Sequence, residues 1–318
     1  MVEYNIGSKI IAHLEQVDKV VAGEIGDIIT CEINSSNCCQ NDCEWCIYKD
    51  YLYSKRCHLD LNVFKKVLVE LKDVHNCKSI TFTGGGEPLV NPKIREMIDF
   101  AKELGFEIGL ITNGVSLDLV FDKIHLFKFI RVSLDATSRE EYIKYKKADY
   151  FYRVCNNIKN ATSRFSIDFG ISMLYLPGNE ESANRFSELG ESLGCTYSQI
   201  KPLVDFDVEK NNVELRKIKG SFQTERHVSE GMLPCQIAGL IGQVSADGCC
   251  YYCCIHAGRD KYRMGNLYTD TFAEILERRK SFIPDFSDCS VCRYMNYAIE
   301  YLKVKDKKYR LLRHIQFL

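Results

Sequence analysis

The chain has 318 residues, enough for one large α/β domain with a smaller appendage, and its 46% hydrophobic and 27% charged residues are ordinary for a globular protein. Its 42 Lys and Arg balance 43 Asp and Glu, which argues against a nucleic-acid partner, because binding phosphates requires a basic face. No apolar run approaches the ~18 residues of a membrane span, so we expect no membrane partner.

The chain carries sixteen cysteines, far more than an ordinary cytosolic enzyme. The first nine residues lack the basic-then-apolar pattern of a secretory signal. We therefore expect a reducing, cytoplasmic setting, in which thiols persist and bind metal. A secreted fold held by disulfides is the alternative.

Residues 1–26 predict a weakly amphipathic lead-in helix, and from Asp27 to Pro202 strand and helix patterns alternate regularly. The expected strands span residues 28–33, 79–83, 107–112, 129–135, 167–175 and 197–202. The expected helices span residues 61–74, 92–104, 116–126, 139–147 with 150–161, and 180–193. This alternation indicates a parallel sheet with right-handed crossovers, but it leaves open whether the sheet closes into a barrel.

Three cysteines, Cys39, Cys43 and Cys46, follow the first expected strand within one short loop. Cysteine thiolates hold iron–sulfur clusters, and three ligands on a four-iron cube leave one iron free to bind something other than protein. The alternatives are a zinc site or three unrelated buried cysteines. Structural zinc sites are usually closed by four ligands, which argues against the first of these.

A glycine run, Gly84-Gly85-Gly86-Glu87, ends the second expected strand. Consecutive glycines allow the backbone to approach a ligand closely, although such a run can also be a plain turn. The third strand ends in Asn113-Gly114, for which ligand contact and a plain turn are equally open.

On the fourth expected strand, Ser133 and Asp135 are two residues apart and therefore predicted to share a face. They look into a cavity if that face is the barrel interior. The alternative is a pair of capping residues at a strand end.

A second cysteine group follows a polar connector at residues 203–234. It comprises seven cysteines, with a Gly265-Asn266-Leu267 element before the last two: Cys235, Cys249, Cys250, Cys253, Cys254, Cys289 and Cys292. A four-cysteine zinc ribbon is the competing interpretation. A site with four ligands would leave three of these seven cysteines surplus.

The cysteine triple, with Trp45 before its last member, resembles the radical S-adenosylmethionine (SAM) enzymes. The second group resembles the SPASM/Twitch branch of that superfamily, and the absence of cysteines after Cys292 favours the shorter Twitch version. The resemblance implies a partial (β/α)6 TIM-like barrel at residues 27–202 and a small cysteine-rich domain with a C-terminal helix at residues 235–318.

The resemblance also implies two [4Fe–4S] clusters and SAM as cofactors. The SAM-binding cluster would be held by Cys39, Cys43 and Cys46, and a closed auxiliary cluster, suited to electron transfer, by Cys235, Cys253, Cys289 and Cys292. The residues around SAM would be Trp45 through its backbone carbonyl, Gly85, Gly86, Glu87, Ser133, Asp135 and Arg153. The amino group of SAM would meet the Glu87 carboxylate or nearby backbone carbonyls.

For Arg153, a solvated helix arginine is the alternative to pairing with the SAM carboxylate. For the surplus cysteines, the options are a ligand in place of Cys253, hydrogen donation to a substrate radical by Cys249, Cys250 or Cys254, or inert burial.

The implied activity is reductive cleavage of SAM to a 5′-deoxyadenosyl radical that abstracts a hydrogen atom from substrate. A ribosomally made peptide is our first expectation for that substrate. A small alcohol or amino sugar is the second, and a non-catalytic zinc module is a remote third. An external one-electron reductant such as flavodoxin or ferredoxin, and a separate peptide-recognition protein, are the implied partners.

Overall fold

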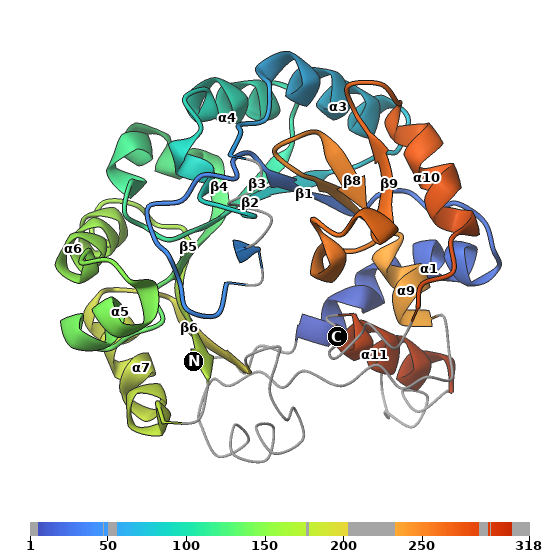
Figure 1. Cartoon of the computed structure of the whole chain (residues 1–318). Helices are drawn as coiled ribbons and strands as arrows, with labels where there is room; N and C mark the ends of the chain where they lie inside the picture. Colours follow the sequence, from blue (N-terminus) through green and yellow to red (C-terminus); the bar gives the residue numbers. More distant parts are fainter. Residues whose placement is uncertain are drawn as a thin grey trace.

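The computed structural model describes residues 6–46, 48–49, 56–175, 178–202, 233–285, 292 and 294–306. The expected connector at residues 203–234 therefore lies almost wholly outside the described residues, and so does Cys289. The expected α/β fold is confirmed: seven parallel strands in the order β6-β5-β4-β3-β2-β1-β7 follow an arc with helices along its outer side (Figure 1). Within the described residues β6 and β7 are edge strands, so the sheet stays open.

The strands lie close to their predicted positions. They are β1 (Thr30–Asn34), β2 (Ser79–Thr83), β3 (Glu107–Thr112), β4 (Phe127–Ser133), β5 (Asp168–Tyr175), β6 (Tyr197–Pro202) and β7 (Ile241–Val244). Helices cover the convex side of the sheet. Ile33, Phe82, Ile130 and Ile171 are wholly buried and belong to one core cluster with the helix residue Phe64.

The helices between the strands also match the prediction. They are α3 (Leu61–Asp73), η2 (Pro88–Val90), α4 (Ile94–Glu103), η3 (Leu117–Leu126), α5 (Arg139–Lys146), α6 (Phe151–Thr162) and α7 (Glu180–Ser192). The Asp60 carboxylate caps α3 by accepting from the backbone of Asn62 and Val63. The segment expected as one helix at residues 116–126 is instead two short 3-10 helices, separated by a kink at Val120, whose backbone is not helical (φ −124°).

Strand β7 is the main element that the sequence did not predict. It pairs in parallel with β1, Thr30 opposite Ile241 and Ile33 opposite Val244, so the large sheet includes part of the cysteine-rich region. The remaining elements there are α9 (Leu233–Ala238), the antiparallel pair β8 (Cys249–Tyr251) and β9 (Arg263–Asn266), η4 (Cys254–His256), η5 (Asp260–Tyr262), α10 (Phe272–Ser281) and α11 (Met295–Lys305).

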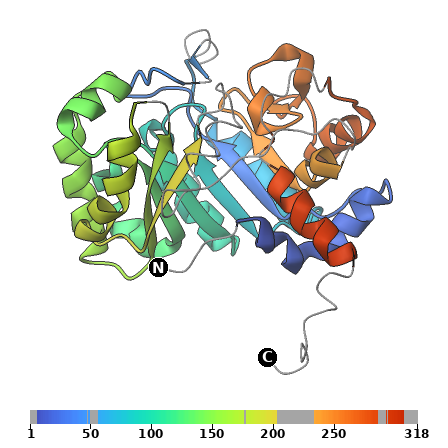
Figure 2. The same ribbon diagram turned by 90° about the horizontal axis from the view of Figure 1, so that it is seen from below.

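The expected C-terminal helix is α11, which packs against the lead-in segment η1 (Ile6–His13) and α1 (Leu14–Val21), as Figure 2 shows. Its Tyr301 hydroxyl donates to the Asp18 carboxylate at 2.6 Å. The two ends of the described chain thereby share one small apolar cluster. No helix in the described part of the chain combines the length and the apolar character needed to cross a bilayer.

Candidate functional site

Four sequence segments meet where the first four strands end. Because β1 to β4 are parallel and adjacent, their carboxyl ends lie at one edge of the sheet. The cysteine loop follows β1, the glycine run follows β2, Thr112-Asn113-Gly114 completes β3, and Asp135 follows β4. This edge contains most of the residues that the sequence singled out.

The cysteine loop docks on the C-terminal end of α5, toward which it crosses the arc (Figure 1). The backbone N–H groups of Asp42 and Glu44 donate to the carbonyl oxygens of Lys146 and Tyr145, both at 3.0 Å. The Trp45 ring lies against Tyr145, with ring centroids 4.9 Å apart. The last carbonyls of a helix have no partner within the helix, so α5 offers acceptors that fix this loop.

The glycine run closes on the same loop from the other side. The Gly86 N–H donates to Ser36 O at 3.0 Å, and the Glu87 N–H donates to Cys38 O at 2.8 Å. A Cβ atom at Gly86 would lie 2.4 Å from Cys38 O. Only glycine permits so close an approach, which explains the glycine directly before Glu87.

The Glu87 side chain is 1% exposed and bonded within the protein. Its carboxylate accepts from the Thr112 hydroxyl and the Asn113 N–H, both at 2.6 Å, and from the Leu89 N–H at 3.1 Å. Burial raises the pKa of Glu87, while these donors oppose the rise. We expected the SAM amino group to meet either the Glu87 carboxylate or nearby backbone carbonyls. Because the carboxylate already accepts three hydrogen bonds, the carbonyls are the better candidates.

The Asn113 side chain contacts the cysteine loop. From the sequence alone, a ligand contact and a plain turn were equally possible for this residue. Its Nδ2 group donates to Cys39 Sγ at 3.7 Å and to Gln40 Oε1 at 3.0 Å. Gln40 in turn donates to the Ser116 hydroxyl at 2.8 Å. The Asn-Gly turn after a strand was the available signal for this contact. Nothing in the sequence distinguished it from a plain turn.

Asp135 and Lys146 form a buried ion pair that the sequence analysis did not predict. The two residues are 4% and 3% exposed. The prediction that Asp135 shares a strand face with Ser133 is wrong: β4 ends at Ser133, and Asp135 adopts a left-handed conformation (φ 56°). Its carboxylate meets the Lys146 ammonium and accepts from the Leu174 N–H at 2.7 Å. The Ser133 hydroxyl is half-buried and makes no hydrogen bond to the described residues.

The charge of Lys146 lies under the cysteine loop. Burial alone would lower the pKa of its ammonium, but the attraction of Asp135, helped by Cys43, raises that pKa above its ordinary value. Lys146 therefore stays protonated and lowers the cost of a thiolate at Cys43. The sequence predicted only a helix at residues 139–147 and gave no signal for this role of Lys146.

Arg153 lies on α6, half-exposed, and pairs with Asp118 at 3.4 Å. This is the solvated helix arginine that we considered as the alternative. Exposed ion pairs of this kind contribute little stability.

The three thiols of the loop fit an iron–sulfur cluster by donor chemistry. All three are free, and Cys43 is close enough to the other two for their charges to interact. Burial, reinforced by the Glu87 carboxylate, raises the pKa of Cys39 to about 12, so binding iron must displace a proton. Within the described ranges no three His, Cys, Asp or Glu side chains are close enough to share one metal ion. A cube binds each thiolate through a different iron and so accepts a wider spacing.

The second cysteine group is assembled from separate elements: Cys235 on α9, Cys253 and Cys254 after β8, and Cys292 before α11. Cys253, Cys254 and Cys292 share one apolar cluster with Tyr294, whose hydroxyl lies 3.7 Å from Cys254 Sγ. Burial raises the pKa of Cys253, with the neighbouring Cys254 adding to the rise.

Two of the surplus cysteines point away from that cluster. Cys250 on β8 is buried beside Cys31 of β1, and Cys249 accepts from Asn266 Nδ2 at 3.4 Å. Cys254 lies beside Cys253, and its carbonyl accepts from the Tyr48 hydroxyl at 3.2 Å. That contact links the second group to the segment directly after the first cysteine loop.

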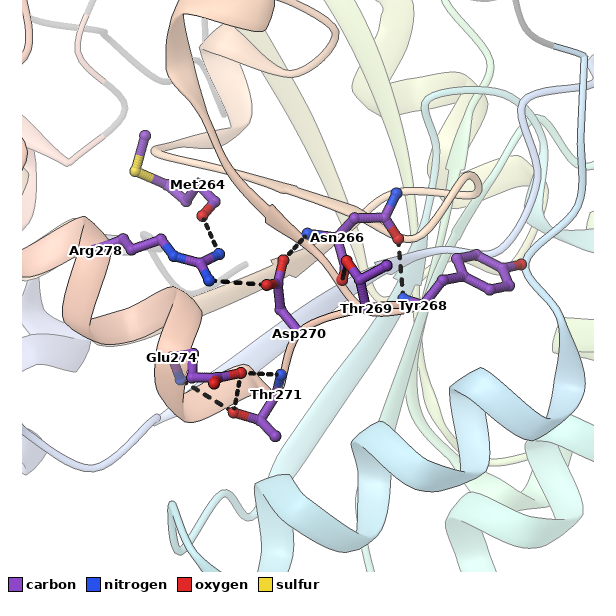
Figure 3. A network of polar contacts seen from close by, with 8 residues as sticks. All are labelled: Met264, Asn266, Tyr268, Thr269, Asp270, Thr271, Glu274 and Arg278. Atoms are coloured by element: carbon purple, nitrogen blue, oxygen red, sulfur yellow. Dashed lines mark hydrogen bonds and ion pairs between the residues drawn. The ribbon is translucent and has the colours of Figure 1, made fainter.

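The Gly265-Asn266-Leu267 element is part of a polar clamp (Figure 3). The Asp270 carboxylate accepts from the Asn266 N–H at 2.7 Å and from Arg278 at 2.8 Å, and Arg278 also donates to Met264 O. The clamp fastens β9 to α10 and thereby holds the β8–β9 pair, whose connecting segment contains Cys253.

Comparison with known proteins relates the chain to one superfamily. The family model described as the Radical SAM superfamily matches residues 33–189. A "Probable GTP 3',8-cyclase" of Saccharolobus solfataricus is 29% identical over 170 residues, 51% of this chain and 53% of that protein. An uncharacterized protein of Methanocaldococcus jannaschii is 32% identical over 123 residues, 37% of this chain and 42% of that protein. The chain thus matches about half the length of these curated relatives.

Solved structures share the fold at low sequence identity. Streptococcus suis SuiB bound to the precursor peptide SuiA has a TM-score of 0.65 at 12% identity, covering 93% of this chain and 76% of that one. The protein anSMEcpe with bound AdoMet and a Cp18Cys peptide has a TM-score of 0.59 at 15% identity, covering 88% and 96%. The fold likeness therefore continues well past residue 189, where the family match ends.

Proposed function

Because the chain belongs to the radical SAM superfamily, we propose that it cleaves SAM reductively and uses the resulting 5′-deoxyadenosyl radical to take a hydrogen atom from a ribosomally made peptide. The observation that carries the proposal is the three-thiol loop, fixed between α5 and the glycine run at the carboxyl edge of the sheet. Cys39, Cys43 and Cys46 would hold a [4Fe–4S] cluster, which when bound supplies the electron for SAM cleavage.

The side chains and backbone around the loop would orient SAM. Carbonyl oxygens of Gly85, Gly86 and Trp45 are proposed acceptors for its ammonium or adenine, since the Glu87 carboxylate already has three donors. The Ser133 hydroxyl, with no partner among the described residues, is a proposed contact for ribose or carboxylate. Asp135 and Arg153 are secondary proposals, because each would have to share its present ion pair.

The second cysteine group is proposed to hold an auxiliary [4Fe–4S] cluster through Cys235, Cys253, Cys289 and Cys292. Four protein ligands would close that cluster to substrate and suit it to electron transfer. The hydrogen bond from Tyr48 to the Cys254 carbonyl supports a short path between the two groups. We propose an external reductant such as flavodoxin or ferredoxin, a cytoplasmic setting and, for peptide delivery, a separate recognition protein.

A peptide is our first choice of substrate because the fold likeness to peptide-bound SuiB covers 93% of the chain and so takes in the second cysteine group. The second candidate is a nucleotide, supported by the sequence likeness to a relative named for GTP, which covers 51% of the chain. Oxidation of a small alcohol or amino sugar has no comparable support.

The test is anaerobic incubation of the reduced, iron-loaded protein with SAM, followed by measurement of 5′-deoxyadenosine. We expect deoxyadenosine from the wild-type chain, more of it with a pool of candidate precursor peptides, and none from Cys43→Ala. Stimulation by GTP and not by peptides would replace the peptide with the nucleotide. No deoxyadenosine from protein that holds iron and sulfide would overturn the proposal.

A further inference from the structure

We propose that Asn113 is a positioning residue that raises the reduction potential of the SAM-binding cluster, by donating an N–H···S hydrogen bond to the Cys39 sulfur. This inference rests on the proposed function, since it requires a cluster on Cys39. It goes further by identifying the side chain that tunes the electron transfer with which the reaction starts.

The orientation of the Asn113 amide is fixed by its two ends. Its Oδ1 atom accepts from the Val115 N–H at 2.9 Å, so the amide cannot be reversed without losing that bond. The Nδ2 group must then face the cysteine loop, where it meets Cys39 Sγ at 3.7 Å and Gln40 Oε1 at 3.0 Å.

The backbone that carries Asn113 is equally constrained. Its N–H donates to the buried Glu87 carboxylate at 2.6 Å. Gly114 follows in a left-handed conformation (φ 80°), and the Asn157 side chain donates to the Gly114 carbonyl at 3.0 Å. Asn113 itself is only 8% exposed. The donor is therefore preorganised and does not have to be ordered when a cluster binds.

A hydrogen bond to a cluster sulfur has a definite electrostatic effect. Reduction adds negative charge that is shared by the cysteine sulfurs, and a donor stabilises the reduced form more than the oxidised form. The effect is large in a site shielded from water. Asn113 should therefore make the cluster easier to reduce, whereas a residue that only packed against the loop would leave the potential unchanged.

Gln40 offers a matched control. It bonds the same Nδ2 group and also Ser116, but none of its described contacts reaches a cysteine sulfur. Removing it perturbs the surroundings of Asn113 while the N–H···S bond stays in place.

The experiment is a potentiometric titration of the full-length, iron-loaded protein, following by EPR the signal that changes when SAM is added. We expect Asn113→Ala to shift the midpoint of that signal to a more negative potential, and Asn113→Asp, which keeps the Val115 acceptor, to shift it further. Gln40→Ala should keep the wild-type value. Wild-type potentials in both Asn113 variants, at wild-type iron content, would overturn the inference.

A second measurement needs no variant at Asn113. Wild-type protein labelled with 15N only at the side-chain amide of asparagine should show a nitrogen coupling to the reduced cluster in pulsed EPR, because this label leaves out the backbone N–H of Asn41, which also bonds Cys39. Absence of that coupling would contradict the inference. If the wild-type chain holds no cluster that responds to SAM, the proposed function fails instead.

Discussion

The two cysteine groups of this chain are built in different ways. The first lies within the eight residues from Cys39 to Cys46, and polar groups from the ends of neighbouring strands and from α5 surround it. The second takes its described cysteines from three separated elements, and aromatic rings such as Tyr294 pack around it. The first is a local motif in a prepared polar setting, whereas the second exists only once the chain has folded.

This difference has a consequence for stability and metal binding. Burial raises the pKa of the thiols in the first group, and buried charges add to or oppose that rise: Glu87 acts on Cys39, and Lys146 and Asp135 act on Cys43. Packing governs the second, which depends on β7 joining the sheet and on the clamp around Asp270. Each of the following predictions tests one side of this contrast.

The largest expected effect is a loss of bound iron from the second cysteine group. Cys253→Ala should remove about half of the iron, because one of two four-iron clusters loses a ligand. Cys254→Ala is the matched neighbour, and it should retain nearly all of the iron. Iron and sulfide analysis of the two variants shows which cysteine is the ligand. Loss of iron in Cys254→Ala but not in Cys253→Ala would make Cys254 the ligand.

At the first group, Lys146→Met should lower the free energy of unfolding by about 3–5 kcal/mol, because it leaves the Asp135 carboxylate buried without its partner. Denaturant unfolding measures the loss. The double variant with Asp135→Asn should recover much of it, since asparagine tolerates the left-handed backbone at that position. A single variant as stable as wild type would show that the pair is not buried in solution.

Much of the first group and of the fold could be predicted from the sequence. The regular alternation of strand and helix patterns predicted the positions of the strands in residues 27–202. The spacing of Cys39, Cys43 and Cys46 predicted the first cysteine group. Strand β7 could not be found, because Ile241-Gly-Gln-Val is four residues long and contains a glycine, so its strand character comes from pairing with β1. Lys146 could not be found either, since only the folded chain shows that it is buried.

A smaller effect is expected for Glu87→Gln, which replaces one accepting oxygen with a donor facing Thr112 or the Asn113 N–H. The loss should be about 1–3 kcal/mol, the usual cost of leaving a buried donor unpaired. Urea unfolding of the variant measures it. Wild-type stability would mean that the carboxylate does not hold the ends of β2 and β3 together.

The smallest effect concerns the clamp. Arg278 and the Asn266 N–H lower the pKa of Asp270 to about 2. Because the pKa of Asp270 is lower in the folded chain than in the unfolded chain, where it is about 4, the carboxylate stabilises the fold above that pH. This stabilisation is lost as the pH falls through about 2. Asp270→Asn should therefore lower the melting temperature slightly at neutral pH and flatten its acid dependence in that window. Identical pH profiles for variant and wild type would contradict the role of this carboxylate.

The most direct test of the whole account is the EPR spectrum of the reduced, iron-loaded protein before and after addition of SAM. We predict a [4Fe–4S] signal that changes on adding SAM, persists in Cys253→Ala and disappears in Cys43→Ala. A spectrum that SAM leaves unchanged, or a protein that binds zinc at the first loop in place of iron, would contradict the account.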